Sequence, residues 1–219
     1  MPTSTPDLSP AGRPTGYTSR HRLSTEARQR EIVATVLALA RERGPEAITT
    51  QAIADRMGLT QGAVFRHFPD KEAIWLAVFA WVRESLGAAF TSAMAKADSP
   101  LGRIEQAFLA HVSFIAANPG VPRVMFHELQ FPGDSAVRTD VRTMITSYRQ
   151  RLMRLFAQAK AAGELPDDLD TALAAVLFIG AVQWLVIQAS LADDDAGMVR
   201  QARKLFPLLL DGYRGRNKA

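Results

Sequence analysis

The chain of 219 residues contains no cysteine, and that absence removes several kinds of chemistry at once. It excludes disulfide bonds, thiolate metal sites and a cysteine nucleophile, and it fits the reducing cytoplasm, where we expect the protein to act. Long apolar runs are also absent: the longest, residues 173–191, is interrupted by Gln183 and Gln188, so we predict no membrane span. The N-terminus lacks the apolar block of a signal peptide.

Motifs of catalysis are scarce as well. The sequence has no glycine-rich phosphate loop and no G-x-S-x-G turn. His111, His127 and Glu128 form the one plausible metal or acid–base set, but its two histidines stand sixteen residues apart and lack the short spacing of metal ligands. We therefore expect no metal, no cofactor and no enzymatic activity; a divalent-metal effector site made by these three residues is the weaker alternative.

Charge of one sign does not dominate either. The formal net charge is +4, and residues 1–80 carry ten Lys or Arg against eight Asp or Glu, so neither half is strongly basic. This balance is compatible with a nucleic-acid partner, provided that a few well-placed cations make the contacts.

Helical periodicity is what the sequence has in abundance. Residues 1–22, rich in proline and glycine and basic at their end, predict a disordered tail. From residue 26 onward apolar residues recur at helical spacing and no alternating strand pattern is found, which predicts an all-α fold. The longer helices expected after the first part of the chain are 70–96, 101–117, 121–130, 135–162, 168–191 and 195–213.

A helix-turn-helix pattern lies between residues 49 and 70. Gly58 supplies the left-handed residue that ends one short helix, and Leu59 is the hydrophobic residue of the turn. Val64 and Phe68 share one face of the second short helix and are expected to pack against the preceding helix. Thr49 or Thr50 is predicted to cap a first short helix that runs to Met57, and Thr60 a second that runs to Phe68. Pro69 ends the second helix, and Asp70 caps the long helix that follows.

Polar and small residues stay outside this small core, where the start of a recognition helix meets DNA. Gln61 can read adenine, Ala63 can touch a thymine methyl, and Gly62 allows close approach of the backbone. Lys71 stands in the first turn of a helix, where a cation is disfavoured unless an anion faces it; a solvated lysine fits the same pattern. The predicted DNA-binding residues are Thr49, Thr50, Gln51, Thr60, Gln61, Gly62, Ala63, Phe65, Arg66, His67 and Lys71.

Residues 24–80 resemble the N-terminal domain of the TetR-type, tetracycline-repressor-like transcriptional regulators. The residues that carry this resemblance are Thr49, Ile53, Ala54, Gly58 to Gly62, Phe65 to Phe68, Lys71 and Glu72. The family usually has tyrosine where this chain has Phe65, so a phosphate contact from that hydroxyl is missing.

The resemblance implies a homodimeric repressor. Such a protein binds an inverted-repeat operator in double-stranded DNA and is released by a small-molecule effector, here expected to be largely apolar. It also implies a helix-turn-helix DNA-binding domain at residues 23–70 and a helical effector-binding and dimerisation domain at 71–219.

The two last predicted helices are candidates for the dimer interface. Residues 171–191 are apolar almost all round, which requires burial on several sides, and Gly180 is costly mid-helix unless another backbone approaches it. We expect a four-helix interface with the symmetry mates, although the same pattern fits the core of one protomer. The predicted interface residues are Phe178, Gly180, Gln183, Ile187, Leu205, Phe206 and Leu209.

An effector pocket is expected among the helices of residues 101–162 and 168–191. Aromatic and methionine side chains with a few polar groups suit an apolar ligand, and each of them also fits an ordinary core. The predicted pocket residues are Phe108, His111, Val112, Met125, Phe126, Leu129, Tyr148 and Trp184.

A second hypothesis stands beside the repressor. The chain would then be a helical small-molecule-binding or enzymatic protein whose helix-turn-helix does not bind DNA. Salt-sensitive, sequence-selective binding to a duplex separates the two hypotheses, because only the first requires it.

Overall fold

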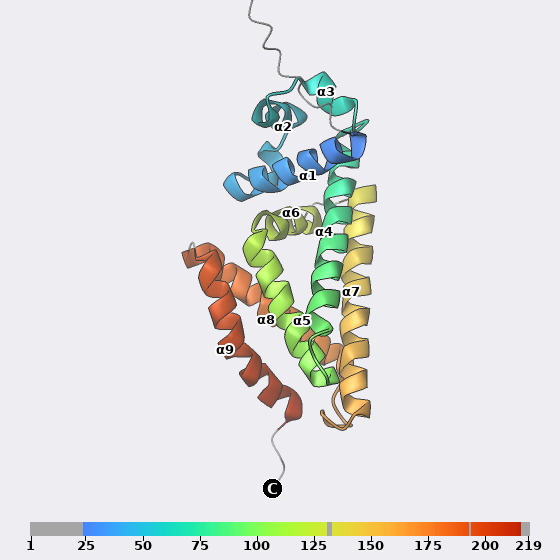
Figure 1. The fold of residues 1–219 in the computed structure, drawn as a ribbon, viewed down its shortest axis with the longest axis vertical. Coiled ribbons are helices and arrows are strands. Elements are labelled where there is room, and N and C mark those ends of the chain that lie inside the picture. Colours follow the sequence, from blue (N-terminus) through green and yellow to red (C-terminus); the bar gives the residue numbers. More distant parts are fainter. Residues whose placement is uncertain (1–23, 131–132, 193, 216–219) are drawn as a thin grey trace, which may run out of the picture.

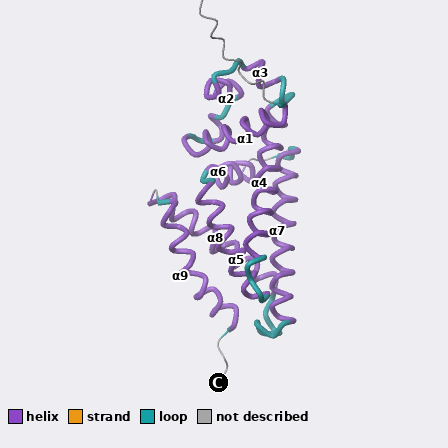
Figure 2. Tube along the Cα trace, viewed as in Figure 1, coloured by secondary structure: helices purple, strands orange, loops and turns teal. Residues whose placement is uncertain are grey.

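The computed structural model describes residues 24–130, 133–192 and 194–215, and these residues form helices joined by short turns. No strand occurs in these ranges (Figure 2), and the all-α prediction is confirmed. The predicted tail, residues 1–22, lies outside the described residues. The helices are α1 Thr25–Glu42, α2 Thr50–Met57, α3 Gln61–Phe65, α4 Lys71–Met94, α5 Pro100–Ala117, α6 Gly120–Gln130, α7 Ala136–Ala161, α8 Thr171–Ala192 and α9 Asp195–Arg214, with a 3-10 turn at Pro45–Ala47.

Helices α1 to α3 lie together at one end of an elongated molecule, and α4 leads from them into the other helices (Figure 1). Ile32, Val36 and Leu39 of α1 are fully buried, as is Val64 of α3. Burying such side chains stabilises the small domain by about 1.5–3 kcal/mol each. Its core is the one that the apolar spacing predicted.

The ends of the short helices are fixed by side-chain caps. The Thr49 hydroxyl accepts a hydrogen bond from the Ala52 amide at 3.0 Å, and the Thr60 hydroxyl accepts from the Ala63 amide at 3.2 Å. Gly58 has φ +63°, the left-handed conformation that a helix end favours. These caps confirm the predicted turn and settle the choice between two threonines for Thr49.

Helix α3 is shorter than predicted. It ends at Phe65, where the His67 amide donates to the Val64 carbonyl three residues back, the spacing of a tighter 3-10 turn, and shares that carbonyl with the Phe68 amide. Pro69 restricts the residue before it, so the chain leaves the helix before Phe68. The Asp70 carboxylate then caps α4 by accepting from the Ala73 amide at 2.7 Å, as predicted.

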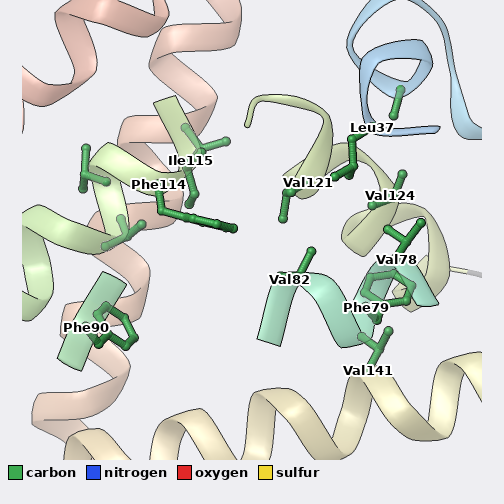
Figure 3. Close-up of a cluster of buried hydrophobic side chains, with 14 of the residues drawn as sticks. Leu37, Val78, Phe79, Val82, Phe90, Phe114, Ile115, Val121, Val124 and Val141 are labelled. Atoms are coloured by element: carbon green, nitrogen blue, oxygen red, sulfur yellow. The ribbon is translucent and has the colours of Figure 1, made fainter. Parts of the chain in front are cut away.

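The second part of the molecule is a bundle of longer helices. In it, α4 and α7 run side by side with α5 next to them (Figure 1), α8 packs against α7 and α9, and α9 packs against α5 and α8. Phe108 of α5 contacts Phe178 of α8 and Phe206 of α9, with ring centroids 5.2 and 5.5 Å apart. Figure 3 shows another part of this core, where Val82, Phe114 and Val121 from three helices point toward one another.

Helix α6 lies across α1 and forms what we call the interdomain contact, made by Gly120 and Arg123. A Cβ atom added to Gly120 would lie 2.3 Å from the Leu37 carbonyl oxygen, so only glycine permits this approach. The Arg123 guanidinium donates to the Arg41 carbonyl at 2.5 Å, at the C-terminal end of α1. The two groups of helices therefore meet through backbone as well as through α4.

Two helices, α4 and α8, are long and apolar enough to cross a membrane by length and composition alone. They include the 173–191 segment, which its two glutamines led us to exclude. Core helices of a helical bundle pass the same test, so the finding is weak evidence for a membrane.

Candidate nucleic-acid interface and effector site

The N-terminal ends of α2 and α3 lie next to each other on the surface. The Gln61 side-chain amide donates to the Thr50 hydroxyl at 2.7 Å, which joins the first turn of α3 to the first turn of α2. Gln51 is held by its own helix, donating to Asp55 at 2.6 Å. Two neighbouring helix starts that carry polar side chains form a surface suited to an anionic partner.

The predicted DNA-binding residues are not all on this surface. Most of them are exposed, including Gly62, Arg66 and the ring of Phe65, which is 41% exposed. Ala63 is buried, at 8% exposure, next to the fully buried Val64 in the chain. We therefore remove Ala63 from the base-contacting set. The exposed members are Thr49, Gln51, Thr60, Gln61, Gly62, Phe65, Arg66 and Lys71, while Thr50 and His67 are half-buried.

Two cations on this surface have no acidic partner in the described residues. Arg66 and Lys71 are exposed and take part in no ion pair there, in contrast to Arg56, which pairs with Glu42. That pair lowers the pKa of the Glu42 carboxyl through its hydrogen bond to Arg56. A cation left free beside two helix starts has its charge available for a phosphate.

One residue that positions the end of α3 was not predicted from the sequence. The Gln29 side chain of α1 donates to the His67 carbonyl at 2.9 Å and ties the end of α3 to the first helix. A polar residue on an amphipathic helix gives no signal for such a bond, which depends on how α1 and α3 cross.

The helical bundle contains a small cavity of about 40 Å³, which we call the inner cavity. Three predicted pocket residues, His111, Met125 and Phe126, lie on its wall. The other residues of its wall are Val82, Leu86, Phe114, Ile115, Val121, Pro122 and Gln183. The contribution of α4 was not predicted, because the pocket was expected among residues 101–162 and 168–191 only.

A second cavity of about 220 Å³, the outer cavity, opens between α4 and α7. Tyr148, also predicted, lines it, and its hydroxyl group lies 2.8 Å from Nδ1 of His111. Burial lowers the pKa of His111 to about 4 and raises that of Tyr148, so both groups are neutral at physiological pH. His111 lines the inner cavity and Tyr148 the outer cavity, so their hydrogen bond joins the walls of the two.

The remaining predicted pocket residues do not join this site. Phe108 and Val112 are fully buried in the core, and Leu129 packs against it. Trp184 is 56% exposed, on the outer face of α8. The spacing identified buried helix faces for Phe108, Val112 and Leu129 but not for Trp184, and it did not separate core from cavity.

Helix α8 presents an exposed apolar face, which we call the outer stripe. Its members, Leu173, Leu177, Gly180, Trp184, Ile187 and Leu191, are separated alternately by four and three residues, the spacing of a coiled-coil seam. Two predicted interface residues, Gly180 and Ile187, belong to it, and Leu205 is half-buried on α9.

Four predicted interface residues lie elsewhere. Phe178, Phe206 and Leu209 are buried inside the protomer, and the Gln183 side chain reaches the inner cavity. Because α8 is apolar on all sides, its periodicity does not indicate which side faces the protomer core.

No group of three or more His, Asp or Glu side chains in the described ranges is arranged to hold a metal ion. His127 instead lies 3.9 Å from a Glu46 oxygen, and His111 bonds to Tyr148. The three-residue set considered above does not come together, because His111 faces the bundle interior.

Comparison with known families matches both parts of the chain. Residues 32–78 match the model of the bacterial regulatory proteins of the tetR family, and residues 97–187 match that of the tetracyclin repressor-like C-terminal domain. The nucleoid occlusion factor SlmA of Haemophilus influenzae is 30% identical over 107 residues, 48% of this chain and 49% of SlmA. The chain therefore spans about half the length of this relative.

Solved structures share the fold over most of the chain. The fatty acid degradation regulator FadR of Bacillus halodurans has a TM-score of 0.74 at 20% identity, covering 86% of this chain and 97% of FadR. AibR, solved in complex with isovaleryl coenzyme A and operator DNA, has a TM-score of 0.63 at 22% identity, covering 73% and 85%. The helix-turn-helix, the helical second domain and the two family matches agree, and the chain belongs to the TetR family of bacterial transcriptional regulators.

Proposed function

We propose that this protein is a homodimeric repressor that binds an inverted-repeat operator and is released by a small, largely apolar effector. The observation that carries this proposal is the exposed surface of α2 and α3, with Arg66 and Lys71 unpaired in the described residues. Its action is regulatory and not catalytic, and its place is the cytoplasm, where the operator is. AibR, similar in fold, was solved with operator DNA and a coenzyme A thioester.

In this proposal α3 enters the major groove with its first turn facing the bases. Gln61 reads a base edge, while Thr49, Thr60 and Lys71 hold the phosphates on either side. Two copies of α3 in a dimer, about 34 Å apart, then meet successive major grooves on one face of the duplex. Because the dimer is symmetric, the operator is an inverted repeat.

Lys71→Ala is expected to weaken binding to every duplex by about tenfold, because a phosphate contact carries no sequence information. The slope of log affinity against log salt falls by about 0.9 for each protomer, one counterion contact being lost. Fluorescence anisotropy over a salt series measures both quantities. Lys96→Ala, which removes the same charge at the other end of α4, is the control, and equal slopes for the two variants would refute the phosphate contact.

Gln61→Ala is expected to act differently. It removes a base-edge contact and lowers discrimination at one base pair of each half-site by about 1–3 kcal/mol, while affinity for random DNA changes little. Selection from random duplexes, sequenced for the parent and the variant, checks this. If the variant recovers the parent's motif unchanged at every position, Gln61 does not read a base.

Effector binding is coupled to operator binding through the helices that contact both domains. Helix α4 carries buried Ile74 and Val78 at its DNA-binding end and Val82 at the inner cavity, and α6 carries both the interdomain contact and the cavity wall. A ligand that moves α4 or α6 thus changes the placement of α3. Release requires that the effector bind the DNA-incompetent arrangement more tightly than the competent one.

A further inference from the structure

The inner cavity contains polar atoms that the protein does not satisfy. Oε1 of Gln183 is buried and has no hydrogen-bond partner in the described part of the chain. His111, only 7% exposed, bonds through Nδ1 to Tyr148, and its Nε2 has no partner there. An unmade hydrogen bond of a buried group is costly, so Oε1 of Gln183 points to a hydrogen-bonding guest in this cavity, whose wall His111 shares.

The chemistry of that guest follows from the two atoms. The neutral imidazole of His111 carries one N–H. We assign the Tyr148 hydroxyl as the donor to Nδ1, which places that N–H on Nε2. The cavity then presents one donor, from His111, and one acceptor, from Gln183. A hydroxyl group satisfies both at once, whereas a carboxylate would be buried without a cation.

The size of the inner cavity limits what enters it. About 40 Å³ is close to the share of liquid volume of one water molecule and much smaller than a ligand site. Apolar residues such as Val82, Phe114 and Val121 make up the rest of the wall and are visible in Figure 3. The cavity therefore holds only the end of a ligand, and the body must lie outside it.

The outer cavity is suited to that body. Phe90, Met94 and Leu155 form apolar parts of its wall, and Arg151 and Arg154 stand at its exposed edge without an ion pair in the described residues. The Tyr148 ring, stacked on Phe90 at 5.5 Å, separates this cavity from His111. Rotation of one side chain, with loss of one hydrogen bond, would join the two spaces.

We propose that the two cavities are the ends of one effector site, closed between them by the Tyr148 ring, for an elongated apolar molecule with an anionic group at one end and a hydroxyl at the other. The hydroxyl meets His111 and Gln183, and the anion meets Arg151 and Arg154. This inference rests on the proposed function only in calling the ligand an effector, since the site itself is independent of DNA.

The test uses three probe series of about eight to sixteen carbons, spanning the range that a joined cavity can hold. They are ω-hydroxy fatty acids, plain fatty acids of the same length, and α,ω-diols, each titrated into the full-length protein by calorimetry. At the best-fitting length the hydroxy acid is expected to bind about tenfold more tightly than the plain acid, which lacks the inner hydrogen bonds. It is also expected to bind about tenfold more tightly than the diol, which lacks the charge.

Two variants assign these differences to the named residues. Gln183→Leu, which keeps the volume, should bring the hydroxy acid down to the affinity of the plain acid and leave the plain acid unchanged. Arg151→Gln with Arg154→Gln should weaken both acids and leave the diol unchanged. Thermal melts of both variants establish that they are folded.

Three results would overturn the inference: no probe binds, plain and hydroxy acids bind equally, or the hydroxyl preference survives Gln183→Leu. DNA binding of the ligand-free protein is measured separately. Normal DNA binding without probe binding would overturn this inference alone, whereas probe binding without DNA binding would overturn only the proposed repressor.

Discussion

Trp184→Glu is expected to convert the protein to monomers and to abolish operator binding. In the proposed dimer the outer stripe of α8 is buried against its symmetry mate, so one substitution places two carboxylates in an apolar interface. Burying two unpaired charges raises the dimer dissociation constant by at least about a hundredfold. A monomer presents one recognition helix and loses the second half-site. Analytical ultracentrifugation reports the association state, and anisotropy reports DNA affinity.

Two companion variants make this experiment specific. Trp184→Phe keeps an apolar ring and should stay dimeric, while Gln150→Glu adds the same charge on an exposed position of α7 and should change neither property. If Trp184→Glu remains a dimer with full DNA affinity, the outer stripe is not the interface. Gly180 supports the proposed role, since a Cβ there meets nothing within 4 Å in the protomer, which leaves room for a partner's backbone.

Gly120→Ala is expected to damage the junction between the two domains. The added methyl would lie 2.3 Å from the Leu37 carbonyl oxygen, a backbone atom that cannot rotate away, so α6 must shift from α1. Overpacking of this kind lowers the free energy of unfolding by about 1–3 kcal/mol, which corresponds to a melting temperature about 3 °C lower or more. The shift also disturbs the Arg123 bond to Arg41 and should speed amide exchange at the end of α1.

A matched substitution distinguishes the steric clash of an added methyl group from the effect of replacing glycine itself. Gly87 lies inside α4, and a Cβ added there meets nothing within 4 Å. Gly87→Ala is therefore expected to leave stability unchanged or to raise it by about 0.5–1 kcal/mol. Equal melting temperatures for Gly120→Ala and the parent protein would show that α6 does not rely on this close approach.

Local signals predicted the DNA-binding end well. Thr49, Thr60, Gly58 and Asp70 cap or end their helices as expected, because capping depends on a residue and its nearest neighbours. Ala63 was misplaced because α3 is a single irregular turn, too short for periodicity to tell its buried side from its exposed side. The Gln29 bond to His67 links distant residues and leaves no local trace.

The sequence predicted where the helices of the second domain lie but not which of their residues line the cavity. Helix α8 is apolar all round, so Phe178 and Ile187 look alike in sequence although one is in the core and the other on the surface. The inner cavity depends on where α4, α5, α6 and α8 leave space, and Gln183 gained its meaning only from that packing. Which side of a helix faces a cavity depends on tertiary packing, and the spacing of apolar residues alone does not determine it.

The central claim is that the exposed N-terminal ends of α2 and α3 bind DNA, and that the two copies in a symmetric dimer contact the two half-sites. Selection from a pool of random duplexes with the purified full-length protein, at physiological salt, tests it most directly. We predict recovery of an inverted repeat whose half-sites are about one helical turn apart or a small multiple of it. Recovery of no preferred sequence, with binding no tighter than to random DNA, would contradict the account and favour a ligand-binding protein whose helix-turn-helix no longer contacts DNA.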